Sequence, residues 1–121
     1  MRSCIAGGRI GGTLLAWRLA QRPEVEHVDL LLGDERRADA TELSEGVVVE
    51  RRAGYVDATR LRSALIADLG ARANVRVVAA PASAVVVHGD GTATVSTSGG
   101  RRTHDVAVLA TGAWTSSVLA A

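Results

Sequence analysis

Four glycines between residues 7 and 12 form the part of this sequence best suited to hold a ligand. A short apolar run, residues 4–6, precedes them, and an Ala/Leu-rich amphipathic stretch follows. This order is typical of a strand, a tight turn and a helix N-terminus, where free backbone N–H groups meet the positive end of the helix dipole. Such a turn can hold a phosphate or pyrophosphate, so the sequence predicts a dinucleotide site. The candidate contacts in the turn are Gly7, Gly8, Arg9, Gly11 and Gly12.

Nucleophilic and metal chemistry have little support in the sequence. The single cysteine, Cys4, falls inside the first predicted strand, where we expect it to be a small core residue. The three histidines, at positions 27, 88 and 104, do not have metal-ligand spacing, so we expect no metal site. Ser116 and Ser117 have no nearby His/Asp pattern that would activate a hydroxyl. We therefore assign no catalytic residue.

Composition favours one small domain, which we place at residues 1–121. The net charge of +1 gives no strong basic field, which argues against a nucleic-acid partner. No apolar run approaches the length of a membrane span, so we expect no membrane association. A single cysteine allows no intramolecular disulfide, which favours a cytoplasmic protein.

The elements that would position the glycine turn follow from hydrophobic periodicity. Short apolar runs predict strands in one mainly parallel sheet, and apolar residues at helical spacing predict helices on its faces. Asp57 is the expected N-cap of the second helix. A Gly-Asp-Gly turn at 89–91 predicts an antiparallel hairpin. The strands are expected at 2–6, 28–32, 75–79 and 106–110, the helices at 11–21 and 57–71, and the hairpin at 84–97. The fold class is therefore α/β, of the Rossmann-like dinucleotide-binding kind.

The order of four stretches resembles the FAD-binding portion of the D-amino-acid-oxidase-like flavoproteins, which include glycine and sarcosine oxidases. The stretches are the turn at 7–12, the loop at 40–44, the Gly-Tyr-Val-Asp element at 54–57 and the strand end at 108–114. The resemblance implies FAD as cofactor and an oxidoreductase of the amine- or amino-acid-oxidase type. In that family a substrate domain interrupts the chain before the Gly-Tyr-Val-Asp element. This chain passes from Val49 to Gly54, so the family's substrate-binding residues have no counterpart.

The resemblance also implies cofactor contacts outside the glycine turn. Ala40 and Thr41 match a loop that wraps the FAD diphosphate. Thr111 and Gly112 match a segment that passes close to the phosphates and the ribityl chain. Ser83 falls where family members contact the adenine through backbone atoms.

An acidic residue at the end of the second strand holds the ribose hydroxyls in such domains. Here that position falls at Leu32 or Gly33. Asp34 and Glu35 follow immediately, and Asp34 is our candidate after a small shift. The alternative is that both belong to a solvated acidic loop.

The middle glycine of the turn is replaced by Arg9 if Gly7 and Gly12 are the first and third. That position normally has no side chain, so that the pyrophosphate can approach the backbone. Arg9 would either block the phosphates or pair with them. We expect exclusion to prevail, or backbone strain if the position requires a positive φ. An alternative register, with Gly8 as the middle glycine, fits the following helix less well.

Three functions stay open at this point. The first is an FAD-binding domain or subunit of a flavoprotein oxidoreductase. The second is a non-catalytic Rossmann-like protein that acts through a partner chain, and the third is a small NAD(P)-binding protein. Apolar segments at 47–49 and 118–119 would be exposed without a substrate domain, so we expect a protein partner or a homo-oligomer.

Overall fold

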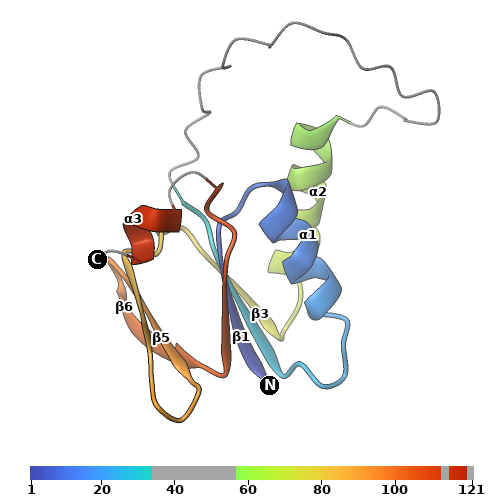
Figure 1. The fold of residues 1–121 in the computed structure, drawn as a ribbon. Helices are drawn as coiled ribbons and strands as arrows, with labels where there is room; N and C mark the ends of the chain where they lie inside the picture. The colour runs from blue at the N-terminus through green and yellow to red at the C-terminus, as the bar shows by residue number, and fades with distance from the viewer. Residues whose placement is uncertain (34–56, 113–114, 120–121) are drawn as a thin grey trace, which may run out of the picture.

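A four-stranded parallel sheet forms the centre of the fold (Figure 1). The computed structural model describes residues 1–33, 57–112 and 115–119. The sheet contains β1 (Arg2–Ala6), β2 (His27–Leu31), β3 (Val75–Val78) and β7 (Val106–Leu109). Their order is β3-β2-β1-β7, and all neighbours run parallel. The predicted neighbouring parallel strands at 2–6 and 28–32 are confirmed, with the second strand one residue earlier.

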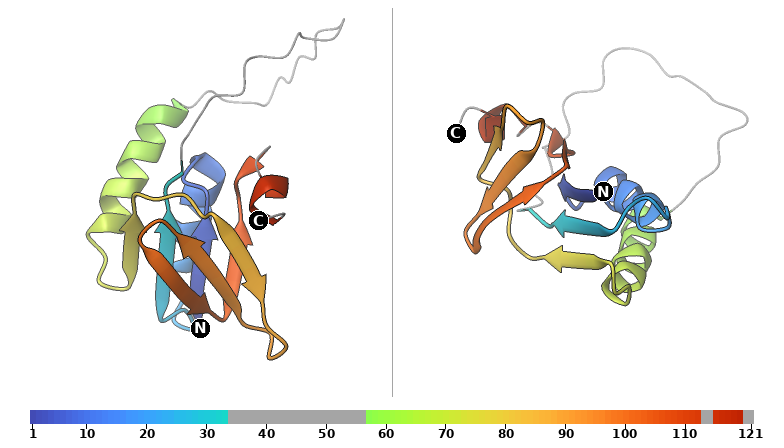
Figure 2. Two further views of the ribbon diagram at one scale, coloured as in Figure 1. Left: turned by 90° about the vertical axis from the view of Figure 1, so that its left-hand side faces the viewer. Right: turned by 90° about the horizontal axis from the view of Figure 1, so that it is seen from below.

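Two helices cover one face of this sheet (Figure 2). They are α1 (Ile10–Leu19) and α2 (Ala58–Gly70), within two residues of the predicted bounds. Ile5, Leu30 and Leu69 are fully buried where the helices meet the sheet. Asp57 caps α2 as predicted, because its Oδ1 accepts a hydrogen bond from the Arg60 backbone N–H at 3.1 Å. Within the described ranges, none of the helices reaches the length and apolar character needed to cross a membrane.

An antiparallel sheet of three strands covers the other face of the parallel sheet, opposite α1 and α2 (Figure 2). Its strands are β4 (Ala84–Val87), β5 (Ala93–Thr97) and β6 (Gly100–His104). β4 and β5 form the predicted hairpin. The sequence does not predict β6, because its Arg-Arg-Thr-His segment is polar and is typical of a turn. It nevertheless pairs with β5 along its whole length.

The second core lies between the two sheets. Cys4 and Leu31 of the parallel sheet pack there with Val95 of β5. A short helix, α3 (Thr115–Leu119), adds Val118, which is 7% exposed. The expected apolar patch at 118–119 is therefore wrong for Val118, although Leu119 is 60% exposed. The segment 47–49 lies outside the described residues.

The strand order creates one place where the chain changes direction across the sheet. From β1 the chain moves to β2 and β3 on one side, and it returns to the opposite side of β1 as β7. All four strands point the same way, so their carboxyl ends lie along one edge. Ligands of open α/β sheets bind at such a switch point, outside the carboxyl ends. The glycine turn follows β1 at this edge.

Candidate functional site

Two glycines of the turn have no room for a side chain. Gly7 has φ +120°, and a Cβ on it would lie 2.2 Å from the Ala110 carbonyl oxygen. A Cβ on Gly12 would lie 1.9 Å from the Gly7 carbonyl oxygen, whereas one on Gly11 would meet nothing within 4 Å. Gly7 and Gly12 therefore have the roles of the first and third glycines, in tight turning and in close packing of helix on strand. This geometry favours the register with Arg9 in the middle over the one centred on Gly8.

Hydrogen bonds from two helices hold the turn. The Gly8 carbonyl oxygen accepts one from the buried Thr13 hydroxyl at 3.0 Å and another from Nε of Arg62 on α2. The Gly7 N–H donates to the Leu31 carbonyl at 3.0 Å. The N–H groups of residues 10–12 belong to the first turn of α1, where helix geometry provides no intrahelical acceptor. The turn thus presents fixed donors toward the sheet edge.

Arg9 is the N-cap residue of α1 and has φ −73° and ψ 177°. This extended conformation is open to any residue, so the expectation of backbone strain is wrong. The alternative expectation was that the Arg9 side chain sterically excludes a phosphate. The backbone angles do not test it. Arg9 is exposed, and it provides no side-chain cap for the helix.

The segment that follows β7 lies directly against the turn. A Cβ on Gly7 would come within 3.2 Å of the Thr111 backbone nitrogen. Gly112 follows with φ +60°. The Thr111 hydroxyl is hydrogen-bonded to the Thr115 hydroxyl at 2.8 Å, and Thr115 in turn donates to the Gly112 carbonyl. Thr111 and Gly112 therefore join the glycine turn at the switch point.

Of the predicted cofactor contacts outside the turn and the β7 end, the structure describes Ser83. Ser83 precedes β4, and both its N–H and its hydroxyl donate to the Ser96 carbonyl, at 2.8 and 3.2 Å. Its backbone donor is thus used within the antiparallel sheet. The candidate residues Asp34, Ala40 and Thr41 lie outside the described residues.

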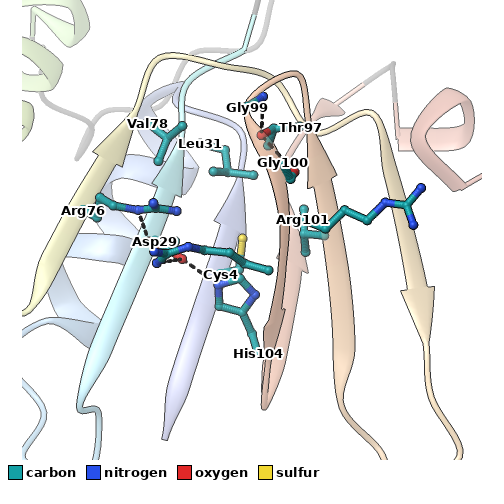
Figure 3. A pocket seen from close by; sticks show the side chains of 12 residues that line it. Cys4, Asp29, Leu31, Arg76, Val78, Thr97, Gly99, Gly100, Arg101 and His104 are labelled. Atoms are coloured by element: carbon teal, nitrogen blue, oxygen red, sulfur yellow. Dashed lines mark hydrogen bonds and ion pairs between the residues drawn. The ribbon is translucent and has the colours of Figure 1, made fainter.

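A cluster of charged side chains between the sheets was missed from the sequence (Figure 3). Asp29 on β2 is fully buried, and its carboxylate accepts from Arg76 Nε at 2.8 Å. His104 Nε2 lies 2.6 Å from the other carboxylate oxygen, and His27 Nε2 lies 3.0 Å from the first. The signals were an acid inside an apolar strand and a histidine two residues before it, on the same face. Because Asp29 is paired with Cys4 and Arg76 in the strand register, one row across the sheet contains all three.

The electrostatics of this cluster argue against a cysteine nucleophile. Burial, and then the neighbouring Asp29 charge, raise the pKa of the Cys4 thiol to about 12. The thiol is protonated at neutral pH, and His104 is hydrogen-bonded to Asp29. Cys4 is thus the small core residue that was predicted. No group of three or more His, Cys, Asp or Glu within the described ranges is placed to hold a metal ion.

The carboxyl of Asp29 makes stability depend on pH. Burial opposes its ionisation, but hydrogen bonds from His104, His27 and Arg76 outweigh burial and lower its pKa from 3.8 to about 2. Between these values the unfolded chain takes up a proton that the folded chain does not. We therefore expect this contribution to be complete above about pH 5 and to be lost as the pH falls toward 2. Urea unfolding from pH 7 to 2 measures it, and a steeper acid loss in wild type than in Asp29→Asn is the expected result.

Comparison with solved structures finds the same fold at low sequence identity. A Bacillus anthracis protein assigned as the thioredoxin reductase TrxB matches 93% of this chain with a TM-score of 0.67 and 15% identity. An oxidoreductase from Agrobacterium tumefaciens matches 89% with a TM-score of 0.60 and 19% identity. A copper(II) complex of a mutant of the flavoprotein disulfide reductase RclA from Escherichia coli matches 97% with a TM-score of 0.51 and 17% identity. These matches confirm the Rossmann-like fold class.

The likeness covers only part of each neighbour. The chain spans 36% of the Bacillus protein, 35% of the Agrobacterium protein and 23% of RclA. No family model matches the sequence, and no similar curated protein was found. At these identities the comparisons establish the architecture alone.

Proposed function

We propose that residues 1–121 are the FAD-binding domain of a flavoprotein oxidoreductase. The observation that carries the proposal is the pair Gly7 and Gly12, each of which has backbone where a Cβ would stand. That packing leaves the first-turn N–H groups of α1 open at the switch point of the sheet. The fold shared with RclA, which is described as a flavoprotein, supports the same direction.

The described residues have distinct tasks in this proposal. The N–H groups at 10–12 would hold the pyrophosphate, while Thr13 and Arg62 fix the turn through the Gly8 carbonyl. Thr111 and Gly112 would lie beside the cofactor, because β7 ends against the turn. Bound FAD would supply hydride or electron transfer. Asp34, Ala40, Thr41 and Ser83 remain predicted contacts of the ribose, the diphosphate and the adenine.

The proposed type of oxidoreductase rests on the sequence motifs alone. The four stretches that resemble D-amino-acid-oxidase-like proteins favour oxidation of an amine or amino acid. The substrate class is therefore proposed from the motifs, and no substrate residue is assigned. A cytoplasmic location remains a prediction from the single cysteine.

Arg9→Gly tests the proposed phosphate site. We expect the variant to bind FAD about tenfold more tightly than wild type, because in the proposed register the long side chain would occupy the space where a pyrophosphate approaches the backbone. Fluorescence titration of FAD, with the flavin absorption bands of the purified protein, measures both affinity and occupancy. Because φ at this position is −73°, Arg9→Ala should change affinity in the same direction.

A charge control separates exclusion from electrostatics. Arg22 is exposed beyond the far end of α1, so Arg22→Ala removes the same charge away from the turn. It should leave FAD affinity unchanged. If Arg9→Gly instead binds FAD more weakly, Arg9 is a phosphate ligand and the expectation of exclusion is wrong. If no variant binds FAD, the proposed cofactor is wrong.

The second candidate function is a non-catalytic domain that acts through a partner chain. It is favoured by exposed apolar residues on β4, where Val86 is 53% and Val87 is 74% exposed. β4 pairs with β5 on one side, so among the described strands it is an edge. A colourless protein that elutes in a defined complex would favour this function. Binding of NAD(P)H without FAD would favour the third one, a small NAD(P)-binding protein.

A further inference from the structure

A cavity of about 260 Å³ lies between the two sheets, beside the Asp29 cluster (Figure 3). It is on the face of the parallel sheet opposite α1 and α2, whereas the glycine turn leads into α1. Asp29 and Arg76 line it from the parallel sheet, and Arg102 and His104 line it from β6. Leu31, Val78 and Val95 add apolar wall. The proposed FAD site uses none of these side chains.

The charges around the cavity do not cancel. Asp29 is the one acid among its described lining residues, and its carboxylate is already engaged by Arg76, His27 and His104. Arg102 Nη1 lies 3.8 Å from Asp29 Oδ2, which is too far for a hydrogen bond. Two guanidinium groups thus face one carboxylate, from opposite sheets. The surplus is one positive charge even with both histidines neutral.

The guanidinium groups keep donors available for a ligand. Each has five N–H groups, and Arg76 uses its Nε toward Asp29. The side chains of Arg76 and Arg102 are 43% and 47% exposed, so solvent and solutes reach them. A guanidinium fork matches the oxygen atoms of a carboxylate or phosphate.

A buried polar atom in the same lining lacks a partner. The His104 side chain is 2% exposed, and its Nε2 is used by Asp29. Its Nδ1 has no hydrogen-bond partner in the described structure. Native proteins satisfy the great majority of such atoms, and a bound water or ion is one explanation for an exception.

We propose that this cavity binds a small organic anion, whose carboxylate or phosphate group is held between Arg76 and Arg102. The apolar wall formed by Leu31, Val78 and Val95 would contact its carbon skeleton. The cavity is smaller than the pockets that hold drug-sized ligands, which limits the ligand to a small metabolite.

Arg101 and Arg102 provide a matched pair for the test. They are neighbours on β6, so their side chains point to opposite faces of the strand. Arg101 also contributes to the cavity lining, but Figure 3 shows its guanidinium directed away from Asp29 and Arg76. Arg101→Gln and Arg102→Gln remove the same charge, but only the second removes a proposed ligand. Because Arg102 makes no hydrogen bond to Asp29, its replacement should leave the fold intact.

Isothermal titration calorimetry at constant ionic strength, with inorganic phosphate and succinate as probes, measures the binding. We expect wild type and Arg101→Gln to bind at least one probe equally, and Arg102→Gln to bind it about tenfold more weakly. Arg102→Lys, which keeps the charge but loses the fork, should fall between them. The stronger probe identifies phosphate or carboxylate as the recognised group.

Three results would overturn the proposal. Wild type could bind neither probe, or both glutamine variants could lose affinity equally, which would indicate a general charge effect. Phosphate binding that survives Arg102→Gln would place the anion at the glycine turn. FAD titration of Arg102→Gln keeps the two sites distinct, because its FAD affinity should equal that of wild type whatever the cavity binds.

Discussion

Asp29→Asn is expected to lower the free energy of unfolding by about 2–3 kcal/mol, the cost of leaving buried hydrogen-bonding groups without their charged partner. The carboxylate is hydrogen-bonded to three side chains on three strands. The bond to His104 on β6 links the two sheets. Asparagine keeps the shape of the side chain but has only one acceptor oxygen. Its NH₂ group would face the N–H donors that the second carboxylate oxygen now accepts from. The buried His104 ring and the Arg76 Nε–H would lose the carboxylate that is their hydrogen-bond partner.

A surface carboxylate provides the control for this result. Asp68 is hydrogen-bonded to Arg72 at 2.9 Å and to Trp17 Nε1 at 3.0 Å, but its side chain is 50% exposed. Asp68→Asn should change stability little, since solvent screens an exposed pair. Urea unfolding of both variants at pH 7 decides the matter. An Asp29→Asn loss no larger than that of Asp68→Asn would mean that the cluster does not hold the sheets together.

Features encoded locally could be predicted from the sequence. The glycine spacing and the apolar strand before it indicated the turn, because a strand–turn–helix needs only neighbouring residues. The continuous Leu30-Leu31-Leu32 run indicated a strand covered on both faces, and β2 is such a strand. Asp57 was recognisable as a cap for the same reason, since its partner is three residues away.

Features that depend on distant partners could not be predicted. Asp29 meets Arg76 and His104 across 47 and 75 residues, so the three appear unrelated along the chain. β6 was missed for a related reason. Its inward residues Arg102 and His104 are polar, and their alternation becomes meaningful only when Asp29 lies opposite them. Part of the interior charge is thus supplied by a strand without a hydrophobic pattern.

For Arg9, the sequence did not predict the backbone conformation. The motif indicated that this position has no side chain when a pyrophosphate approaches, and strain was one physical reason for that. The observed φ of −73° removes that reason and leaves the space above the turn as the deciding quantity. Gly12, the third glycine, differs from Arg9, because a side chain there would meet the protein's own backbone.

Gly12→Ala is expected to destabilise the fold by about 3 kcal/mol, at the upper end of the cost of overpacking. The new methyl group would stand 1.9 Å from the Gly7 carbonyl oxygen, which is backbone and cannot rotate away. Relief requires α1 to move off β1, which would disturb the Thr13 bond to the Gly8 carbonyl. The same movement would displace the N–H groups at 10–12, so FAD affinity should fall as well.

Gly11→Ala is the matched control, because it adds the same methyl group one residue earlier on the same helix. Nothing lies within 4 Å of a Cβ there, and alanine favours a helix over glycine by up to about 1 kcal/mol. Thermal and urea unfolding should therefore show Gly11→Ala equal to wild type or slightly more stable, and Gly12→Ala far less stable. Equal behaviour of the two variants would contradict the close packing of α1 on β1, and with it the argument that Gly7 and Gly12 shape a phosphate-binding turn.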